Sequence, residues 1–176
     1  MNYADIKYCD VANGEGVRVS LFVSGCTHHC KECFNKEAWD FHYGNPFTQK
    51  EIDRILEYLK PNYIAGLSLL GGEPMEPVNQ EGILPLLRAV KQTYPEKNIW
   101  CYTGYLFDKD VLDKMCKESE VTKEIVSYLD IVVDGEFMID RKNLKINFRG
   151  SDNQRIIDVK KTLDAGKIVH WEREIQ

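Results

Sequence analysis

Short apolar segments alternate with helix-forming segments along most of this chain, and this alternation limits the possible folds more than any other feature. Strands are predicted over residues 17–23, 64–70, 99–102 and 129–133, with weaker candidates at 146–148 and 156–159. Strands that are separated by helices form βα units, and hence a parallel sheet with helices packed on its outside. We therefore predict an α/β fold with a mostly parallel sheet. We expect one domain over residues 1–176, with an added tail at about 161–176.

Local signals also predict where helices begin. Thr48 and Glu51 have the spacing of a capping box, so a helix should start there. A second helix is expected over residues 83–90 with Pro85 in its first turn, where a missing N–H costs little. Asp108 is suited to cap a third helix.

Three polar signals directly follow predicted strands. A cysteine cluster follows the first strand, Gly71-Gly72-Glu73-Pro74 follows the second, and Asp134-Gly135 follows a later one. The carboxyl ends of parallel strands meet at one edge of a sheet, and active sites gather there. The three signals should therefore lie close together.

The cysteine cluster consists of Cys26, Cys30 and Cys33, in the spacing C-x3-C-x2-C. Thiolates are soft anionic ligands that suit iron–sulfur clusters and zinc. A closed structural site needs four ligands, whereas a cluster held by three cysteines leaves one iron open. The spacing alone also allows zinc, with His28 or His29 as a fourth ligand.

The other cysteines are not expected to bind metal. Cys101 lies within a predicted strand and Cys116 lies on a predicted helix, where a free cysteine behaves as a small hydrophobe; Cys9 is likewise not expected to be a ligand. The N-terminal segment is polar and does not resemble an export signal. We therefore expect a cytoplasmic protein with reduced thiols.

The charge and hydrophobicity of the chain limit the classes of partner that it is expected to bind. The formal net charge is −5 and no basic run is present, so the sequence lacks the cluster of positive charge that is typical of nucleic-acid-binding proteins. No stretch is long and apolar enough to span a membrane. A protein partner or a small molecule is the better expectation.

The glycine-rich turn permits close contact with a ligand. Gly71 and Gly72 allow a close backbone approach or a positive φ, and Glu73 can accept a hydrogen bond from an ammonium group. Taken alone, the segment is more typical of an ordinary strand-to-helix turn. Thr103 and Tyr105 are weaker candidates for lining the same cleft, and Asp134 is a weaker candidate for contacting a ligand there.

The cysteine spacing and the Gly-Gly-Glu turn together resemble the radical S-adenosylmethionine (SAM) superfamily. This resemblance implies a partial, open (βα) barrel and a 4Fe–4S cluster on Cys26, Cys30 and Cys33. Many members carry an aromatic residue before the last cysteine; here that position is Glu32, and Phe34 follows the cysteine. The SAM contacts implied by the resemblance are Glu32, Cys33, Phe34, Gly71, Gly72 and Glu73.

Three segments resemble the glycyl-radical activating enzymes of that superfamily more closely. Residues 13–18 (NGEGVR) are similar to their opening "NGPG-R" motif, and residues 34–39 (FNKEAW) resemble their "YN…W" run. Residues 148–155 (FRGSDNQR) resemble the "RGSSNQR" signature of proteins that activate anaerobic ribonucleotide reductases, with Asp152 in place of a serine. The resemblance covers about residues 3 to 160.

The resemblance implies a reaction and its partners. A flavodoxin-like donor supplies one electron through the cluster, and SAM is cleaved to a 5′-deoxyadenosyl radical. The radical then takes hydrogen from the Cα of one glycine in the anaerobic ribonucleoside-triphosphate reductase. This transfer needs no general acid or base, so no catalytic side chain is expected.

Three alternatives remain open at this point. The chain could be a radical SAM enzyme with a small substrate, similar to 7-carboxy-7-deazaguanine synthase. It could also be a zinc-binding interaction module without catalysis, or an electron-transfer iron–sulfur protein with a fourth ligand. Chemistry alone assigns no role to residues 148–155, because a solvated polar turn explains their composition equally well.

Overall fold

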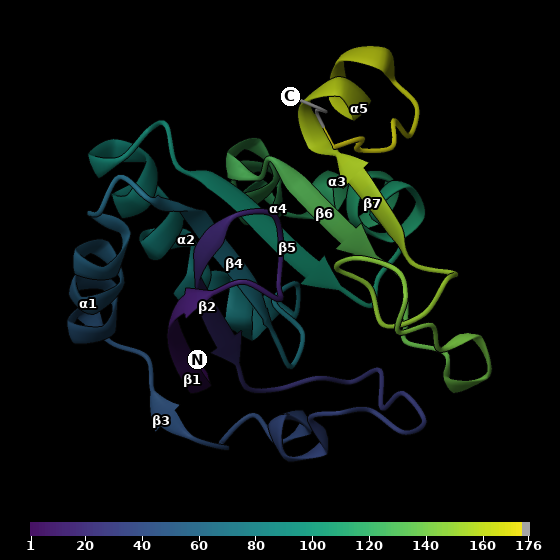
Figure 1. The fold of residues 1–176 in the computed structure, drawn as a ribbon, viewed down its shortest axis with the longest axis horizontal. Helices are drawn as coiled ribbons and strands as arrows, with labels where there is room; N and C mark the ends of the chain where they lie inside the picture. The colour runs from purple at the N-terminus through teal and green to yellow at the C-terminus, as the bar shows by residue number, and fades with distance from the viewer. Residues whose placement is uncertain (174–176) are drawn as a thin grey trace.

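The computed structural model describes residues 1–173, and this part of the chain forms one seven-stranded sheet in the order β3-β1-β2-β4-β5-β6-β7 (Figure 1). The strands are β1 (Asn2–Asp10), β2 (Val17–Val23), β3 (Asn45–Pro46), β4 (Ile64–Gly71), β5 (Asn98–Thr103), β6 (Ile131–Asp134) and β7 (Arg155–Asp158). Strands β2, β4, β5 and β6 pair in parallel, whereas β1 and β7 run antiparallel to their neighbours. The predicted α/β class and mostly parallel sheet are confirmed.

Helices cover one side of this sheet. The α-helices are α1 (Gln49–Leu59), α2 (Pro77–Thr93), α3 (Cys116–Glu118), α4 (Glu120–Tyr128) and α5 (Val159–Ala165). Two 3-10 turns, η1 (Lys36–Trp39) and η3 (Ile139–Arg141), and one π-helix, η2 (Phe107–Met115), complete the described secondary structure of residues 1–173. Helices α1, α2 and α4 contact one another in that order along the sheet (Figure 1).

The alternation of side chains gives the sheet two different faces. Val19, Leu21 and Val23 of β2 are fully buried in the main core beneath the helices. The opposite face carries a smaller apolar cluster around Trp100 and Val133. Loops and the C-terminal segment pack against that cluster through Tyr102, Phe148, Ile156 and Trp171. The helix-free face is therefore the one on which a ligand cavity can form.

Arg18 projects from β2 into this second face and is completely buried. Its Nε donates to Ser68 Oγ at 2.7 Å, and Nη1 donates to Asn98 Oδ1 at 2.7 Å and Glu15 O at 3.0 Å. Its Nη2 donates to Leu67 O at 2.8 Å and Asn98 O at 3.2 Å. Burial lowers the pKa of Arg18 to about 10, despite nearby acidic groups that act in the opposite direction. Five hydrogen bonds therefore hold the guanidinium between three strands.

Gly14 explains part of the NGEGVR motif. Its φ is +117°, and a Cβ there would lie 2.8 Å from Arg18 Cδ and 3.0 Å from the Trp100 ring. Only glycine permits both this backbone conformation and this close approach. The loop before β2 thus closes over the buried guanidinium.

Most predicted elements are present, and the capping box is confirmed. Thr48 Oγ1 accepts from Lys50 N at 3.3 Å, and Glu51 Oε2 accepts from Thr48 N at 2.8 Å. Pro85 was placed wrongly: it lies in the middle of α2, because Pro77 already opens that helix.

Two further sequence predictions were wrong. Leu106, and not Asp108, precedes η2, and the Asp108 carboxylate instead pairs with Arg155 at 2.8 Å. Residues 146–148 form no strand. Phe148 has a φ of +60°, which a strand does not allow.

Strand β1 and helices α4 and α5 were not predicted from the sequence. The predicted tail, residues 161–176, begins inside α5, and its end at 174–176 lies outside the described residues. The segment after α5 folds back along β7, where Trp171 N donates to Ile156 O at 2.9 Å. The Trp171 ring packs against Trp100, with ring centroids 5.3 Å apart.

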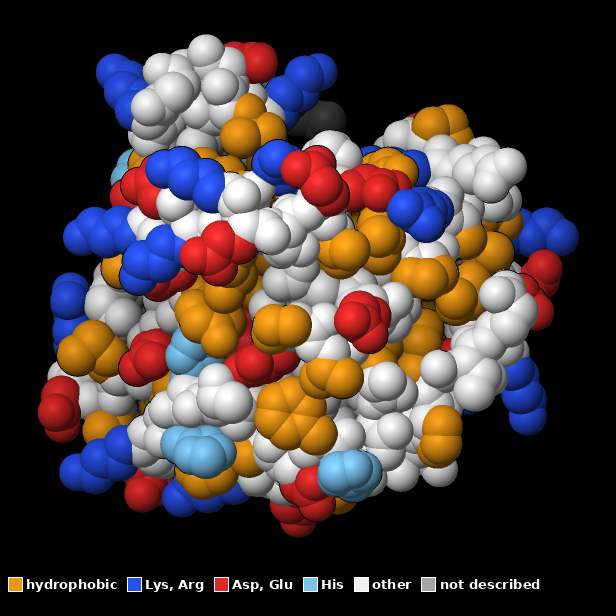
Figure 2. Space-filling model, turned by 180° about the vertical axis from the view of Figure 1, so that it is seen from behind, with side chains coloured by type: hydrophobic (Ala, Val, Ile, Leu, Met, Phe, Trp, Pro, Cys, Tyr) orange, Lys and Arg blue, Asp and Glu red, His pale blue; other side chains and the backbone are white. Residues whose placement is uncertain are grey.

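No helix within residues 1–173 is long and apolar enough to cross a membrane. Figure 2 shows hydrophobic, acidic and basic side chains interspersed over one face of the molecule. Many of the lysine and arginine side chains project around the outline of that view.

Candidate functional site

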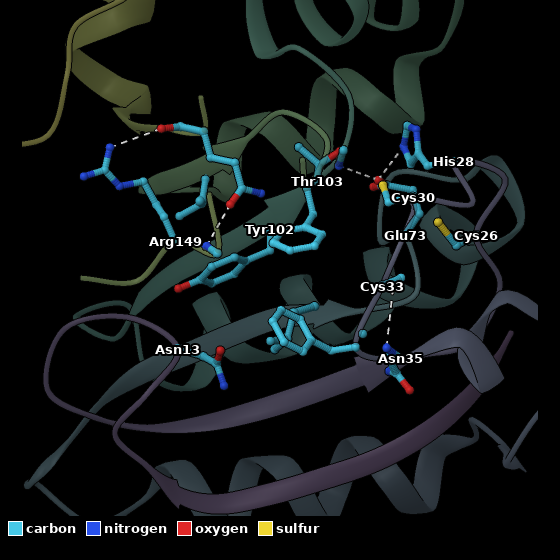
Figure 3. Close-up of a pocket in the computed structure, with 18 of the residues that line it drawn as sticks. Asn13, Cys26, His28, Cys30, Cys33, Asn35, Glu73, Tyr102, Thr103 and Arg149 are labelled. Carbon is cyan, nitrogen blue, oxygen red and sulfur yellow. Dashed lines mark hydrogen bonds and ion pairs between the residues drawn. The ribbon is translucent and has the colours of Figure 1, made fainter. Parts of the chain in front are cut away.

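A cavity of about 540 Å³ opens on the helix-free face, at the carboxyl ends of the parallel strands. The three clustered cysteines and the Gly-Gly-Glu turn line it together with Thr103 and Gly135. Figure 3 shows the cysteines at one end, Tyr102 across the middle and Arg149 at the opposite end. Three segments far apart in sequence are thus brought together, as the strand-end argument predicts.

Backbone hydrogen bonds join the cysteine loop to the Gly-Gly-Glu turn. Gly25 N donates to Ala38 O at 2.7 Å, and Gly25 O accepts from Glu73 N at 2.8 Å. Gly72 N donates to Val23 O at 2.7 Å. A Cβ at Gly72 would lie 2.5 Å from Gly25 O, so a side chain there would force the two loops apart. The second glycine is therefore needed for the contact between them.

The three cysteine thiols differ in exposure but share the cavity. Cys26 is buried, whereas Cys30 and Cys33 are half-buried, and Asn35 N lies 3.5 Å from Cys33 Sγ. Burial raises the pKa of the Cys26 thiol to about 11 and also raises that of Cys30. Bound iron would offset this effect, because coordination favours the thiolate. The remaining cysteines lie outside the cavity, on β1, in β5 and after η2: Cys9, Cys101 and Cys116.

Glu73 is almost completely buried, and three donors fix its carboxylate. Oε1 accepts from Met75 N at 2.8 Å. Oε2 accepts from Gly104 N at 2.7 Å and contacts His28 Nε2 at 2.9 Å. A carboxylate has about four acceptor positions, so about one position, on Oε1, is left for a ligand.

His28 lies between two carboxylates. Its Nδ1 is 2.9 Å from Glu136 Oε1, and its ring packs edge-on against Tyr105. Burial lowers the pKa of His28, but hydrogen bonds and charge from Glu73 and Glu136 outweigh it and raise the pKa to about 9. Both ring nitrogens face carboxylate oxygens, and this geometry favours the form of the imidazole in which both nitrogens donate.

The zinc alternative requires a free ring nitrogen on His28 or His29. Both nitrogens of His28 are engaged, and the His29 ring stacks on Trp39 with centroids 4.6 Å apart. Among residues 1–173, no three His, Cys, Asp or Glu side chains are grouped so as to hold a metal ion. A 4Fe–4S cluster differs from a single ion because each thiolate binds a different iron. Three thiols around one cavity are therefore a donor set that fits such a cluster.

The predicted SAM contacts near the last cysteine fall in different places. Glu32 is exposed with a φ of +57° and does not line the cavity. Its assignment as a SAM contact stays a prediction. Phe34 lines the mouth of the cavity and is 75% exposed. Its ring stacks on Phe137 at 5.3 Å, and Lys142 Nζ lies 5.4 Å from its centroid.

The weaker candidates also differ. Thr103 lines the cavity, whereas Tyr105 lies behind His28. Asp134 does not line the cavity, because its carboxylate accepts from Arg155 Nε at 2.9 Å and Phe107 N at 2.7 Å.

Two buried polar residues that support the site were not predicted from the sequence. Glu76 Oε1 accepts from Thr27 N at 3.1 Å in the cysteine loop. Asn79 Nδ2 donates to Glu73 O at 2.9 Å and Gly25 O at 3.3 Å. Glu73 lies in the turn before α2, Glu76 is the N-cap of that helix and Asn79 lies in its first turn, so the acidic residue next to the predicted turn could have marked Glu76 as a candidate.

The FRGSDNQR segment forms a loop that is tied to the end of β6. Gln154 Oε1 accepts from Gly150 N at 2.9 Å, and its Nε2 donates to Gly135 O at 2.9 Å. Asn153 Nδ2 donates to Glu136 O at 2.9 Å. These hydrogen bonds hold the segment in place as part of the cavity wall, so it is not a freely solvated turn.

Known proteins with similar sequences identify the family. Residues 12–157 match the family described as "4Fe-4S single cluster domain". Three relatives carry the name anaerobic ribonucleoside-triphosphate reductase-activating protein. That of phage T4 is 43% identical over 89% of this chain and 93% of its own length. That of Pasteurella multocida is 40% identical (89% and 96%), and that of Escherichia coli K12 is 38% identical (88% and 96%). This chain belongs to the family of anaerobic ribonucleoside-triphosphate reductase-activating proteins, within the 4Fe-4S single cluster domain family.

Proposed function

We propose that this chain is a radical SAM activase that generates a glycyl radical on an anaerobic ribonucleoside-triphosphate reductase. The observation that carries the proposal is the shared cavity, which brings three thiols and the buried Glu73 carboxylate to one strand edge. The named relatives support the choice of reductase as the partner.

Cys26, Cys30 and Cys33 would hold the cluster, and the Gly-Gly-Glu turn would face SAM. When bound, the cluster supplies one electron for the cleavage of SAM, so that hydrogen can be taken from the glycine Cα. The side chains of the protein bind and orient the cluster and SAM. Glu73 Oε1 would accept from the SAM ammonium group, and the glycines let the backbone approach the ligand.

The fold supports this chemistry. We propose that the parallel strands form the partial, open barrel typical of radical SAM enzymes, with the helix-free face turned to the substrates. Apolar side chains, among them Phe22, Leu70 and Val133, line the cavity and would exclude water from a reactive radical. The exposed side chains Phe34 and Leu144 at its mouth leave the site accessible to a protein partner.

The test starts from protein purified without oxygen. The protein is reduced, with dithionite or a flavodoxin-like donor, and mixed with SAM and an anaerobic ribonucleoside-triphosphate reductase. Electron paramagnetic resonance should show the doublet of a glycyl radical, with 5′-deoxyadenosine released.

Each of the three alternative functions predicts a different result in this experiment. Deoxyadenosine release without the doublet would favour a radical SAM enzyme with a small substrate. Stoichiometric zinc without iron would indicate a binding module. Iron with no SAM cleavage and a fourth protein ligand would indicate an electron-transfer protein.

A further inference from the structure

A continuous series of hydrogen bonds connects the FRGSDNQR loop with Glu73. Asn153 binds the backbone of Glu136, the Glu136 carboxylate binds His28, and His28 binds Glu73. We propose that His28 is a positioning residue that holds Glu73 for the ammonium group of SAM, and that Asn153 acts on it through Glu136. This inference rests on the proposed function, because it assumes that Glu73 receives SAM.

The link between His28 and Glu73 is direct and shielded. The His28 side chain is 10% exposed and that of Glu73 is 1% exposed, with 2.9 Å between Nε2 and Oε2. Charge-assisted hydrogen bonds are strong in such surroundings. With Oε2 held by His28 and Gly104, the carboxylate cannot rotate without breaking two bonds. The remaining acceptor position on Oε1 is thereby fixed in direction.

The space for the imidazole ring is built into the fold. A Cβ at Gly104 would lie 2.6 Å from His28 Cδ2, so the residue after Thr103 must be small for the ring to reach Glu73. On its other side the ring packs against Tyr105, with centroids 4.4 Å apart. An exposed loop histidine would need neither feature.

The link to Glu136 gives residues 148–155 a role. The Glu136 side chain is 55% exposed, and its carboxylate contacts His28. Its position depends on the backbone, which Asn153 and Gln154 hold through Glu136 O and Gly135 O. The loop therefore braces the far side of His28, although its own residues lie on the opposite wall of the cavity from the Gly-Gly-Glu turn.

The test compares two ligands at equilibrium. The oxygen-free iron–sulfur protein is dialysed without reductant against SAM or against 5′-methylthioadenosine, a neutral thioether that lacks the aminocarboxypropyl arm with its ammonium and carboxylate groups. His28→Phe should weaken SAM binding about tenfold, the loss expected for one charge-assisted hydrogen bond. Binding of 5′-methylthioadenosine should change less than about twofold. His28→Gln, which keeps an N–H donor, should recover part of the affinity for SAM.

Two further variants complete the design. His29→Phe, in the same loop but stacked on Trp39, is the matched control and should bind both ligands normally. Asn153→Ala lies far from the cysteines in sequence and should weaken SAM about threefold, but add little to His28→Phe if both act through Glu136. This variant keeps the test valid if His28→Phe does not load iron.

Unchanged SAM affinity in His28→Phe would overturn the inference, as would unchanged affinity in Asn153→Ala where His28→Phe does not load iron. Equal weakening of both ligands would also overturn it. Failure of the unsubstituted iron–sulfur protein to bind SAM would instead reject the proposed function itself.

Discussion

Replacement of Arg18 by lysine should destabilise the protein strongly, although the charge is kept. The arginine presents five N–H groups in a fixed plane, and each has an oxygen partner inside the sheet. A lysine ammonium has three N–H groups at one point. At least two of the five acceptors, which lie in buried or partly buried hydrogen bonds, would therefore lose their donor.

The magnitude follows from these orphaned acceptors. A buried acceptor without a partner costs about 1–3 kcal/mol, so the substitution should lower the free energy of unfolding by roughly 2–6 kcal/mol. A domain of this size is stable by only about 5–15 kcal/mol, so the loss should be evident.

Urea unfolding followed by circular dichroism, under reducing and oxygen-free conditions, measures this difference. Arg141→Lys is the matched control. Arg141 Nε binds Asp152 Oδ1 at 2.6 Å, but both side chains are about half exposed. This control should change stability by less than about 0.5 kcal/mol. An Arg18→Lys protein as stable as the control would refute the reasoning.

Three other predictions concern the site and its surroundings. Gly72→Ala should lower both iron content and melting temperature, because its Cβ would meet a backbone oxygen at 2.5 Å; normal iron loading would contradict this. Cys30→Ala should abolish the iron–sulfur absorbance and SAM cleavage while Cys116→Ala keeps both, and the reverse pattern would reject the ligand assignment. The hydrogen bond from Arg155 lowers the pKa of Asp108, so this carboxylate stabilises the fold above its ordinary pKa of about 4 and loses that effect as the pH falls through the lowered value. The stability difference between the unsubstituted protein and Asp108→Asn should therefore shrink on acidification in pH-dependent unfolding, and a constant difference would be inconsistent with this pairing.

Sequence patterns predicted the central sheet well, because its parallel strands are apolar and end at glycines. Strand β1 escaped notice because it lies near the edge, with several exposed side chains and two register shifts. The segment 146–148 looked like a strand by composition, but the positive φ of Phe148 bends it into the cavity wall. Short apolar runs do not report such backbone turns.

The candidate site, like the fold, could be predicted from the sequence only in part. Cysteines and a Gly-Gly-Glu turn can be recognised by residue type and spacing, and the structure places them in one cavity. The position of His28 depends on Glu73 and Glu136, which are distant in sequence, so the local pattern allowed it to be read as a zinc ligand. Glu32 illustrates the opposite limit, because its place in the motif did not reveal that it faces solvent.

The two ends of the cavity are held in place by different kinds of hydrogen bond. The cysteine end is anchored to the sheet by backbone hydrogen bonds, whereas the opposite end belongs to a loop that Gln154 closes upon itself. Under the proposed function, changes at exposed positions that make none of these bonds, such as Leu144, would alter which polypeptide enters without moving the sulfur atoms or Glu73. Under the proposed function, an activator of this kind would acquire a new target through such surface positions while its cluster-binding half stays unchanged.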